Sequence, residues 1–181
     1  MRLALGSIYQ LTDDKLVFAK QLGVEDVIVH APVDSSLSQG PGYYELLPLI
    51  RLRTKIESYG LRLVAIENIP REWYLKVMLG QEGRDEQIEN FCKTLENMGK
   101  AGIPILGYNF SPTGVWRTCT DMPWRGARVT SFDYDLVKDA PATLGKLNDK
   151  QMWENFTYFL KRVVPVAEEA GVKLALHPDD P

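Results

Sequence analysis

Four short segments of the same kind constrain the fold of this chain more than any other feature. Each joins the end of an amphipathic pattern to the start of an apolar run through a single glycine, at residues 22–24, 59–61, 101–103 and 170–172. Glycine adopts the left-handed backbone conformation that ends a helix without the steric cost of other residues. Returns this short from helix to strand are typical of a parallel sheet whose strands are connected by crossover helices.

The patterns between these glycines alternate between the periodicities of strands and helices. Strands are predicted at residues 1–6, 26–30, 61–66, 104–108 and 172–176, and helices at residues 13–22, 43–59, 85–101 and 149–170. The predicted class is therefore α/β, with an arrangement of the form (βα)4β.

Two architectures fit this arrangement: an open doubly wound sheet and the first part of a (βα)8 TIM barrel. Residues 6–9, Gly-Ser-Ile-Tyr, follow the first strand and lack the glycine-rich fingerprint of a dinucleotide-binding sheet. The loops after the strands are long and those before them are minimal, as in barrels, where the loops after the strands form the functional site. The pattern favours an incomplete (βα)8 barrel. We expect residues 1–181 to be the N-terminal portion of a single TIM-barrel domain, truncated after its fifth strand.

The composition argues against some classes of partner. A net charge of −3 is unfavourable for binding a nucleic-acid backbone. No apolar run approaches the ~20 residues of a membrane span, and the N-terminus lacks the pattern of a signal peptide. We therefore expect a cytoplasmic protein with neither a nucleic acid nor a membrane as partner. A homo-oligomer is compatible with the sequence.

Polar side chains mark the carboxyl ends of the later predicted strands. His30, Glu67, Asn109 and His177 each lie at the end of an apolar run or directly after it. In a parallel barrel these ends meet at one face, where rigid strands place functional groups. Each residue alone has a structural explanation, because a polar group at a strand end often has an ordinary hydrogen-bonding role. Their equivalent positions favour a common functional site.

His177 begins the sequence His-Pro-Asp-Asp-Pro at residues 177–181. A neutral imidazole is a common ligand for Zn, Mn and Fe ions, and Asp179 and Asp180 are candidates for orienting it. A catalytic metal ion needs typically three or more protein ligands, and the sequence offers no second residue in a ligand-spacing motif. The residues alone therefore indicate one metal ligand rather than a complete metal site.

The longest predicted loop, residues 110–148, has little regular periodicity. Its aromatic and arginine residues include Trp116, Trp124, Phe132, Tyr134, Arg117, Arg125 and Arg128. This aromatic content argues against a disordered segment. Arginine pairs with carboxylates in bidentate geometry, so the pattern suits an anionic or polyhydroxylated ligand. The alternative is that the rings only fasten the loop to the barrel rim while the arginines face water.

Several segments match one known family in the right order. They are Gly-Tyr-Asn-Phe-Ser-Pro at 107–112, Val-Trp-Arg-Thr at 115–118, Thr-Ser-Phe-Asp at 130–133 and His-Pro-Asp-Asp-Pro at 177–181. Ile-Glu-Asn-Ile-Pro at 66–70 fits as the end of the third strand. Together these segments resemble the mannonate dehydratase family of xylose-isomerase-like barrels, and the resemblance extends from the first strand to the last residue.

The resemblance implies a hydro-lyase that removes water from D-mannonate to give 2-keto-3-deoxy-D-gluconate in glucuronate catabolism, with Mn²⁺ or Fe²⁺ as cofactor. It makes His177 the first ligand of a His/Cys/His/Asp set whose other members belong to later strands. The 181-residue chain alone is therefore expected to be inactive. The residues expected to contact the small sugar-acid substrate are His30, Glu67, Asn109, Trp116 and Arg117. The catalytic acid and base are not identified.

Residues 111–117, Ser-Pro-Thr-Gly-Val-Trp-Arg, depart from the pattern of the best-known family members, which leaves a related sugar acid open as the substrate. A sugar isomerase or epimerase of the same superfamily is the alternative enzymatic interpretation. The non-enzymatic alternative is an inactive truncated fragment, or a half-barrel that only binds or assembles with a partner.

Overall fold

The computed structural model describes residues 2–30, 40–141 and 144–178. Its main sheet has five strands, all parallel: β1 (Ala4–Ile8), β2 (Asp26–His30), β3 (Arg62–Glu67), β4 (Ile105–Tyr108) and β7 (Lys173–Leu176). They lie in the order β1-β2-β3-β4-β7, which follows the chain. This sequential order confirms the predicted barrel-type arrangement, because an open doubly wound sheet would place the first strand in its interior.

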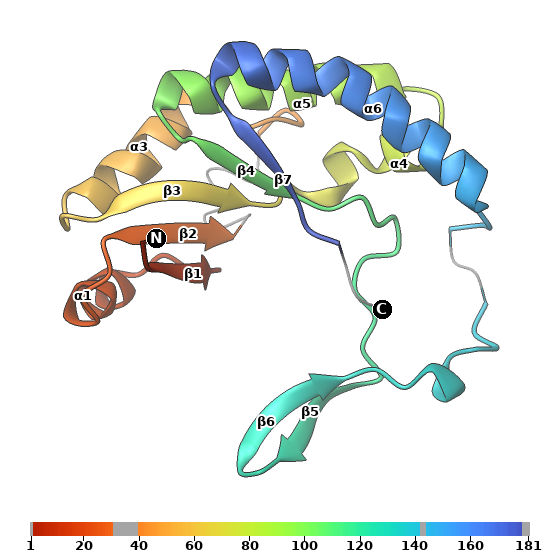
Figure 1. The fold of residues 1–181 in the computed structure, drawn as a ribbon, viewed down its shortest axis with the longest axis horizontal. Coiled ribbons are helices and arrows are strands. Elements are labelled where there is room, and N and C mark those ends of the chain that lie inside the picture. Colours follow the sequence, from red (N-terminus) through yellow and green to blue (C-terminus); the bar gives the residue numbers. More distant parts are fainter. Residues whose placement is uncertain (1, 31–39, 142–143, 179–181) are drawn as a thin grey trace.

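The helices of the (βα)4β pattern are α1 (Asp13–Gln21), α3 (Leu46–Glu57), α5 (Arg84–Ala101) and α6 (Asp149–Ala170). Helices α3, α5 and α6 lie together over one side of the sheet (Figure 1). Helix α6 shows how the sequence defines an element. Asn148 and Gln151 form a capping box at its start, Gly171 ends it with a φ of 68°, and the buried residues recur every fourth position.

The core lies between the sheet and these helices. Phe91 on α5, Phe159 on α6 and Tyr108 on β4 are all buried and meet at its centre. The ring centroids of Phe91 and Phe159 are 4.9 Å apart, and those of Phe91 and Tyr108 are 6.2 Å apart. Edge-to-face packing of this kind holds the strand ends in fixed positions relative to the helices.

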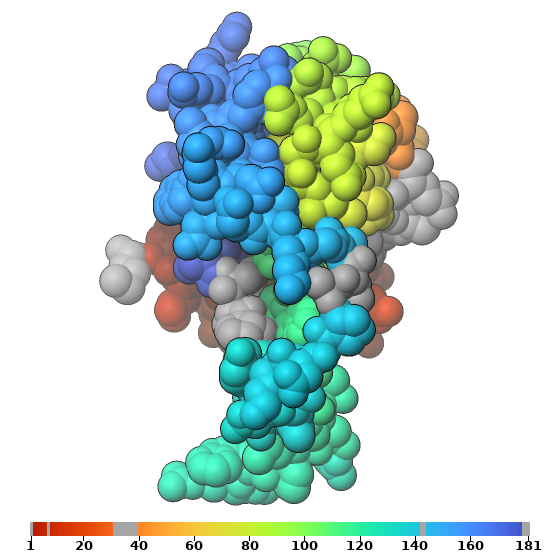
Figure 2. Space-filling view, turned by 90° about the vertical axis from the view of Figure 1, so that its right-hand side faces the viewer, coloured from red at the N-terminus to blue at the C-terminus, as the bar shows by residue number. Residues whose placement is uncertain are grey.

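The prediction that residues 110–148 lack regular structure was wrong. Strands β5 (Cys119–Trp124) and β6 (Ala127–Ser131) pair in an antiparallel hairpin, and the short helix η2 (Tyr134–Leu136) follows it. The turn between the strands has positive φ at both central residues, Arg125 (49°) and Gly126 (85°), as a type I′ turn requires. The hairpin projects from the body as an arm (Figure 2).

Two further short helices, η1 (Arg71–Trp73) and α4 (Leu75–Leu79), lie between β3 and α5 and were not anticipated from the sequence. They matter for the site, because they bring the buried Tyr74 beneath the ends of the strands. Among the helices of the described residues, none combines the length and apolar character needed to cross a bilayer.

Candidate functional site at the carboxyl ends of the strands

The carboxyl ends of β2, β3, β4 and β7 form one polar edge. In the sheet register His30 pairs with Glu67, Glu67 pairs with Gly107, and Tyr108 pairs with Leu176. Asn109 and His177 follow directly after the last two of these residues. The structure therefore confirms that His30, Glu67, Asn109 and His177 lie at the same edge of the sheet, as their positions in the sequence predicted.

A hydrogen-bonded chain of side chains connects three of the strand ends. Asn68, the residue after β3, places its amide nitrogen Nδ2 3.2 Å from Nε2 of His30. Its amide oxygen Oδ1 accepts a hydrogen bond from Nδ2 of Asn109 at 3.4 Å. On the far side of His30, the ring of Tyr9 stacks on the imidazole with the centroids 4.2 Å apart. The partly buried amide of Asn68 is therefore the link between the ends of β2 and β4.

Two fully buried tyrosines support this chain from below. The Tyr74 hydroxyl donates to Asn109, with its backbone oxygen 3.0 Å away and its side-chain oxygen Oδ1 3.3 Å away. The Tyr44 hydroxyl donates to the backbone oxygen of Asn68 at 3.3 Å. Burial raises the pKa of Tyr44 well above its ordinary value, so this phenol stays protonated and remains a donor.

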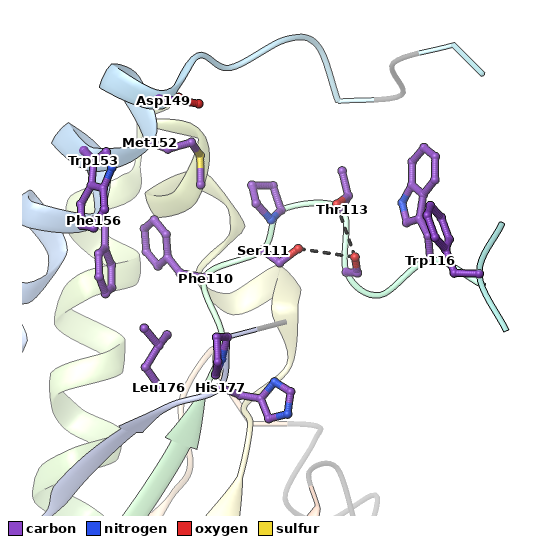
Figure 3. A pocket seen from close by; sticks show the side chains of 14 residues that line it. Phe110, Ser111, Thr113, Trp116, Asp149, Met152, Trp153, Phe156, Leu176 and His177 are labelled. Carbon is purple, nitrogen blue, oxygen red and sulfur yellow. Dashed lines mark hydrogen bonds between the residues drawn. The ribbon is translucent and has the colours of Figure 1, made fainter. Parts of the chain in front are cut away.

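His177 lies at the end of β7, and its backbone N–H donates to the backbone oxygen of Tyr108 at 2.8 Å. Its side chain is exposed. Leu176 and the His177 imidazole point to opposite sides of the strand end, with Leu176 on the side of Phe110 and Phe156 (Figure 3). The alternation of side chains along a strand produces this separation, and it turns the imidazole away from Phe110 and Phe156.

The metal site that the sequence suggested is not complete among the described residues. Within residues 2–30, 40–141 and 144–178, no group of three or more His, Cys, Asp or Glu side chains is arranged to hold a metal ion. The suggested orienting residues Asp179 and Asp180 lie outside the described part of the chain. An exposed imidazole on a rigid strand end is a suitable single ligand for a divalent metal ion.

A cavity of about 620 Å³ adjoins this edge, between the segment after β4, the start of α6 and the end of β7. Its walls are mainly apolar, and the large side chains that line it include Phe110, Trp116, Phe132, Met152, Trp153 and Phe156 (Figure 3). Apolar walls give binding surface but few groups that move protons. The polar edge is therefore the better candidate for chemistry.

The two site residues predicted from the long loop lie at the base of the hairpin arm. Trp116 lines the cavity, as His177 also does. The Arg117 guanidinium donates to the backbone oxygen of Trp116 at 2.7 Å and to the Thr130 hydroxyl at 3.2 Å. These bonds hold the Arg117 side chain against the start and end of the arm.

Sequence reasoning missed Asn68, Tyr74, Tyr44 and Tyr9 as members of the site. Asn68 left a weak signal, because asparagine directly after a strand is one of the few residues that tolerate the left-handed backbone it adopts, with a φ of 66°. The tyrosines left none. Tyr44 and Tyr74 are buried aromatic residues shortly before a helix, which are indistinguishable from ordinary core residues, and Tyr9 is a single exposed aromatic residue after β1.

The family model of D-mannonate dehydratase (UxuA) matches residues 9–146 and 142–181. Mannonate dehydratase of Streptococcus agalactiae serotype Ia is 34% identical over 158 residues, which cover 72% of this chain and 44% of that protein. Mannonate dehydratase 2 of Halalkalibacterium halodurans is 31% identical over 193 residues, which cover 92% of this chain and 54% of that protein.

Solved structures show the same likeness in three dimensions. The crystal structure of mannonate dehydratase from Streptococcus suis serotype 2 superimposes with a TM-score of 0.82 at 29% identity, over 100% of this chain and 54% of that chain. D-psicose 3-epimerase from Clostridium cellulolyticum H10 gives a TM-score of 0.57 at 14% identity, over 97% and 52%, which shows a shared fold alone. The chain spans about half the length of the curated relatives it matches.

Proposed function

The chain belongs to the D-mannonate dehydratase family, because the family model matches almost all of its residues, and from this we propose that the protein containing it dehydrates D-mannonate. The products would be water and 2-keto-3-deoxy-D-gluconate. The observation that supports this most is that the similarity includes the polar edge itself, with β3, β4 and β7 and the residues that follow them. The likeness to D-psicose 3-epimerase supports the fold and adds no argument for epimerase activity.

The reaction sets two demands on a site. A proton must leave C2, which is difficult because a C–H group next to a negatively charged carboxylate is only a weak acid. The hydroxyl on C3 must leave as water. We include a divalent metal ion, Mn²⁺ or Fe²⁺, with His177 as one ligand; when bound, it would stabilise negative charge on the substrate carboxylate. The polar edge suits a sugar acid, because its side chains offer both donors and acceptors for hydrogen bonds with sugar hydroxyl groups.

We assign His30, Glu67 and Asn109 to substrate contact at the polar edge. The Glu67 carboxylate is an acceptor for sugar hydroxyls, and His30 and Asn109 belong to the chain of hydrogen bonds that fixes the edge. Arg117 and Trp116 would approach from the segment after β4, with the guanidinium pairing the substrate carboxylate. Apolar walls beside the edge would exclude water from the bound sugar acid.

The test uses the complete natural protein that contains this sequence, supplied with Mn²⁺. We expect formation of 2-keto-3-deoxy-D-gluconate from D-mannonate, and no interconversion of ketohexoses. His177→Ala should lower metal content and turnover together, because one ligand bond is lost. Lys173→Ala, an exposed change at the opposite end of the same strand, should alter neither. Ketohexose epimerisation without dehydration, or normal metal content in His177→Ala, would refute the corresponding assignment.

Arg117→Ala separates substrate binding from metal binding in the same protein. If the guanidinium pairs the carboxylate, metal content stays normal while kcat/KM falls by roughly 10- to 100-fold, the value of a hydrogen bond to a charged group. Equal loss of metal and activity would show that Arg117 acts through the structure of the arm instead.

A further inference from the structure

The hydrogen-bonded chain at the polar edge has a direction, which a backbone group fixes. The backbone N–H of Ser111 donates to Oδ1 of Asn109 at 3.3 Å. A backbone N–H is only a donor, so the Asn109 amide must present its oxygen to Ser111 and its nitrogen to Asn68. Asn68 must then present Oδ1 to Asn109 and Nδ2 to His30. Since Nδ2 is also only a donor, Nε2 of His30 must be the acceptor.

The backbone of Asn68 keeps its amide in this position. Its φ of 66° is in the left-handed region, and its N–H donates to the backbone oxygen of Gly107 at 2.8 Å. The Tyr44 hydroxyl holds the Asn68 backbone oxygen. The two backbone hydrogen bonds fix the Cα atom of Asn68, and the side-chain hydrogen bonds to His30 and Asn109 fix the orientation of its amide.

We propose that Asn68 is a positioning residue that fixes His30 as the neutral imidazole with its proton on Nδ1. With Nε2 occupied by the Asn68 amide, and with Tyr9 stacked on the ring, both the tautomer and the orientation of His30 are set. His30 then acts at the polar edge as a hydrogen-bond donor through Nδ1–H, and it is neither a base nor a metal ligand through Nε2.

This role rests on the proposed function where it concerns substrate. An N–H donor at a strand end can hold a hydroxyl or carboxylate oxygen of a sugar acid and stabilise negative charge that develops on it. The tautomer itself depends only on the hydrogen-bonded chain and is measurable without any substrate.

The two histidines of the chain, His30 and His177, make the tautomer directly observable. Long-range ¹H–¹⁵N spectra of the 181-residue chain, recorded above pH 8 with His177→Gln used for assignment, report which nitrogen of His30 carries the proton. We expect Nδ1 to be protonated and Nε2 unprotonated. In Asn68→Gly, glycine tolerates the positive φ and the side-chain amide is lost, so the imidazole proton of His30 should redistribute towards Nε2. Asn68→Asp keeps the shape but replaces the donor by an acceptor, so Nε2 should become protonated.

The matched control is the His177 signal, which should not move in either variant. Protonated Nε2 in the wild type, or an unchanged His30 tautomer in both variants, would overturn the proposal, and the isosteric Asn68→Asp keeps the test valid if Asn68→Gly does not fold.

Kinetics of the complete natural protein test whether this positioning matters. Asn68→Gly should lower kcat/KM for D-mannonate by roughly 10- to 100-fold, the range for losing a partner that orients a functional imidazole, with metal content unchanged. An altered tautomer with unchanged kcat/KM would reduce Asn68 to a structural role and overturn the positioning claim. If the wild type shows the expected tautomer but does not dehydrate D-mannonate, the proposed function falls and the effect of Asn68 on His30 stands.

Discussion

Replacing Tyr74 by phenylalanine tests the support beneath the polar edge. Tyr74 is fully buried, and its hydroxyl donates to both oxygens of Asn109, at 3.0 and 3.3 Å. Phenylalanine keeps the ring and its contact with Phe91, whose centroid is 6.0 Å away, so the change removes the hydroxyl and little else. The half-buried oxygens of Asn109 lose a donor, which costs about 1–3 kcal/mol of unfolding free energy.

For a chain of this length, a loss of about 2 kcal/mol corresponds to a decrease in Tm of roughly 4–8 °C. Urea denaturation and thermal melting of the 181-residue chain measure the change. Tyr134→Phe is the matched control, because Tyr134 is 67% exposed and should change stability by less than about 0.5 kcal/mol. Equal stability of the two variants would show that the Tyr74 hydroxyl does not support the edge.

Two further changes probe the fold around the site. Gly80→Ala should destabilise the fold by about 2–4 kcal/mol, because its φ is +67° and a Cβ atom would lie 2.6 Å from Oδ1 of Asn155. Gly23→Ala has a similar φ of +74° but open space around it, so it should cost only about 1–2 kcal/mol. Equal losses of unfolding free energy in chemical denaturation would show that the contact with Asn155 costs nothing. A hydrogen bond from Tyr158 holds the pKa of Asp85 below its ordinary value, so the stabilising contribution of this carboxylate is present at neutral pH and is lost as the pH falls through the lower folded-state pKa. The Tm difference between wild type and Asp85→Asn should therefore be largest near neutral pH and shrink in acid, and a difference independent of pH would contradict the assignment.

Much of the fold was predictable because local signals agreed with the tertiary structure. Helix α6 was predicted with both ends correct, since it begins with an acidic residue and Gly171 ends it. The first strand was placed at residues 1–6, but β1 continues to Ile8 through Gly6, where a Cβ atom would lie 3.1 Å from Ile28. Glycine is needed at this position because the neighbouring strand lies close, but in the sequence a glycine there is indistinguishable from one that ends a strand.

The parts that could not be predicted depend on long-range contacts or lack a buried face. Every residue of β5 is exposed, so no alternation between core and solvent marked the hairpin in the sequence. The alignment of His30, Glu67, Asn109 and His177 followed from strand ends alone, and it was predictable. The link through Asn68 was not, because it joins residues about forty positions apart that meet only when the strands pair in register.

The most direct test of the account is where D-mannonate binds. In the 181-residue chain the imidazole signal of His30 reports on the polar edge alone, and that of His177 reports on the edge and on the cavity that it also lines. The indole signal of Trp153 reports on the cavity. With the diamagnetic ion Mg²⁺ present, D-mannonate at millimolar concentrations should shift both imidazole signals along one binding curve, and an equal concentration of D-fructose should not. Shifts of Trp153 with the His30 imidazole unmoved would place the sugar acid in the cavity and contradict the assignment of the polar edge as the site.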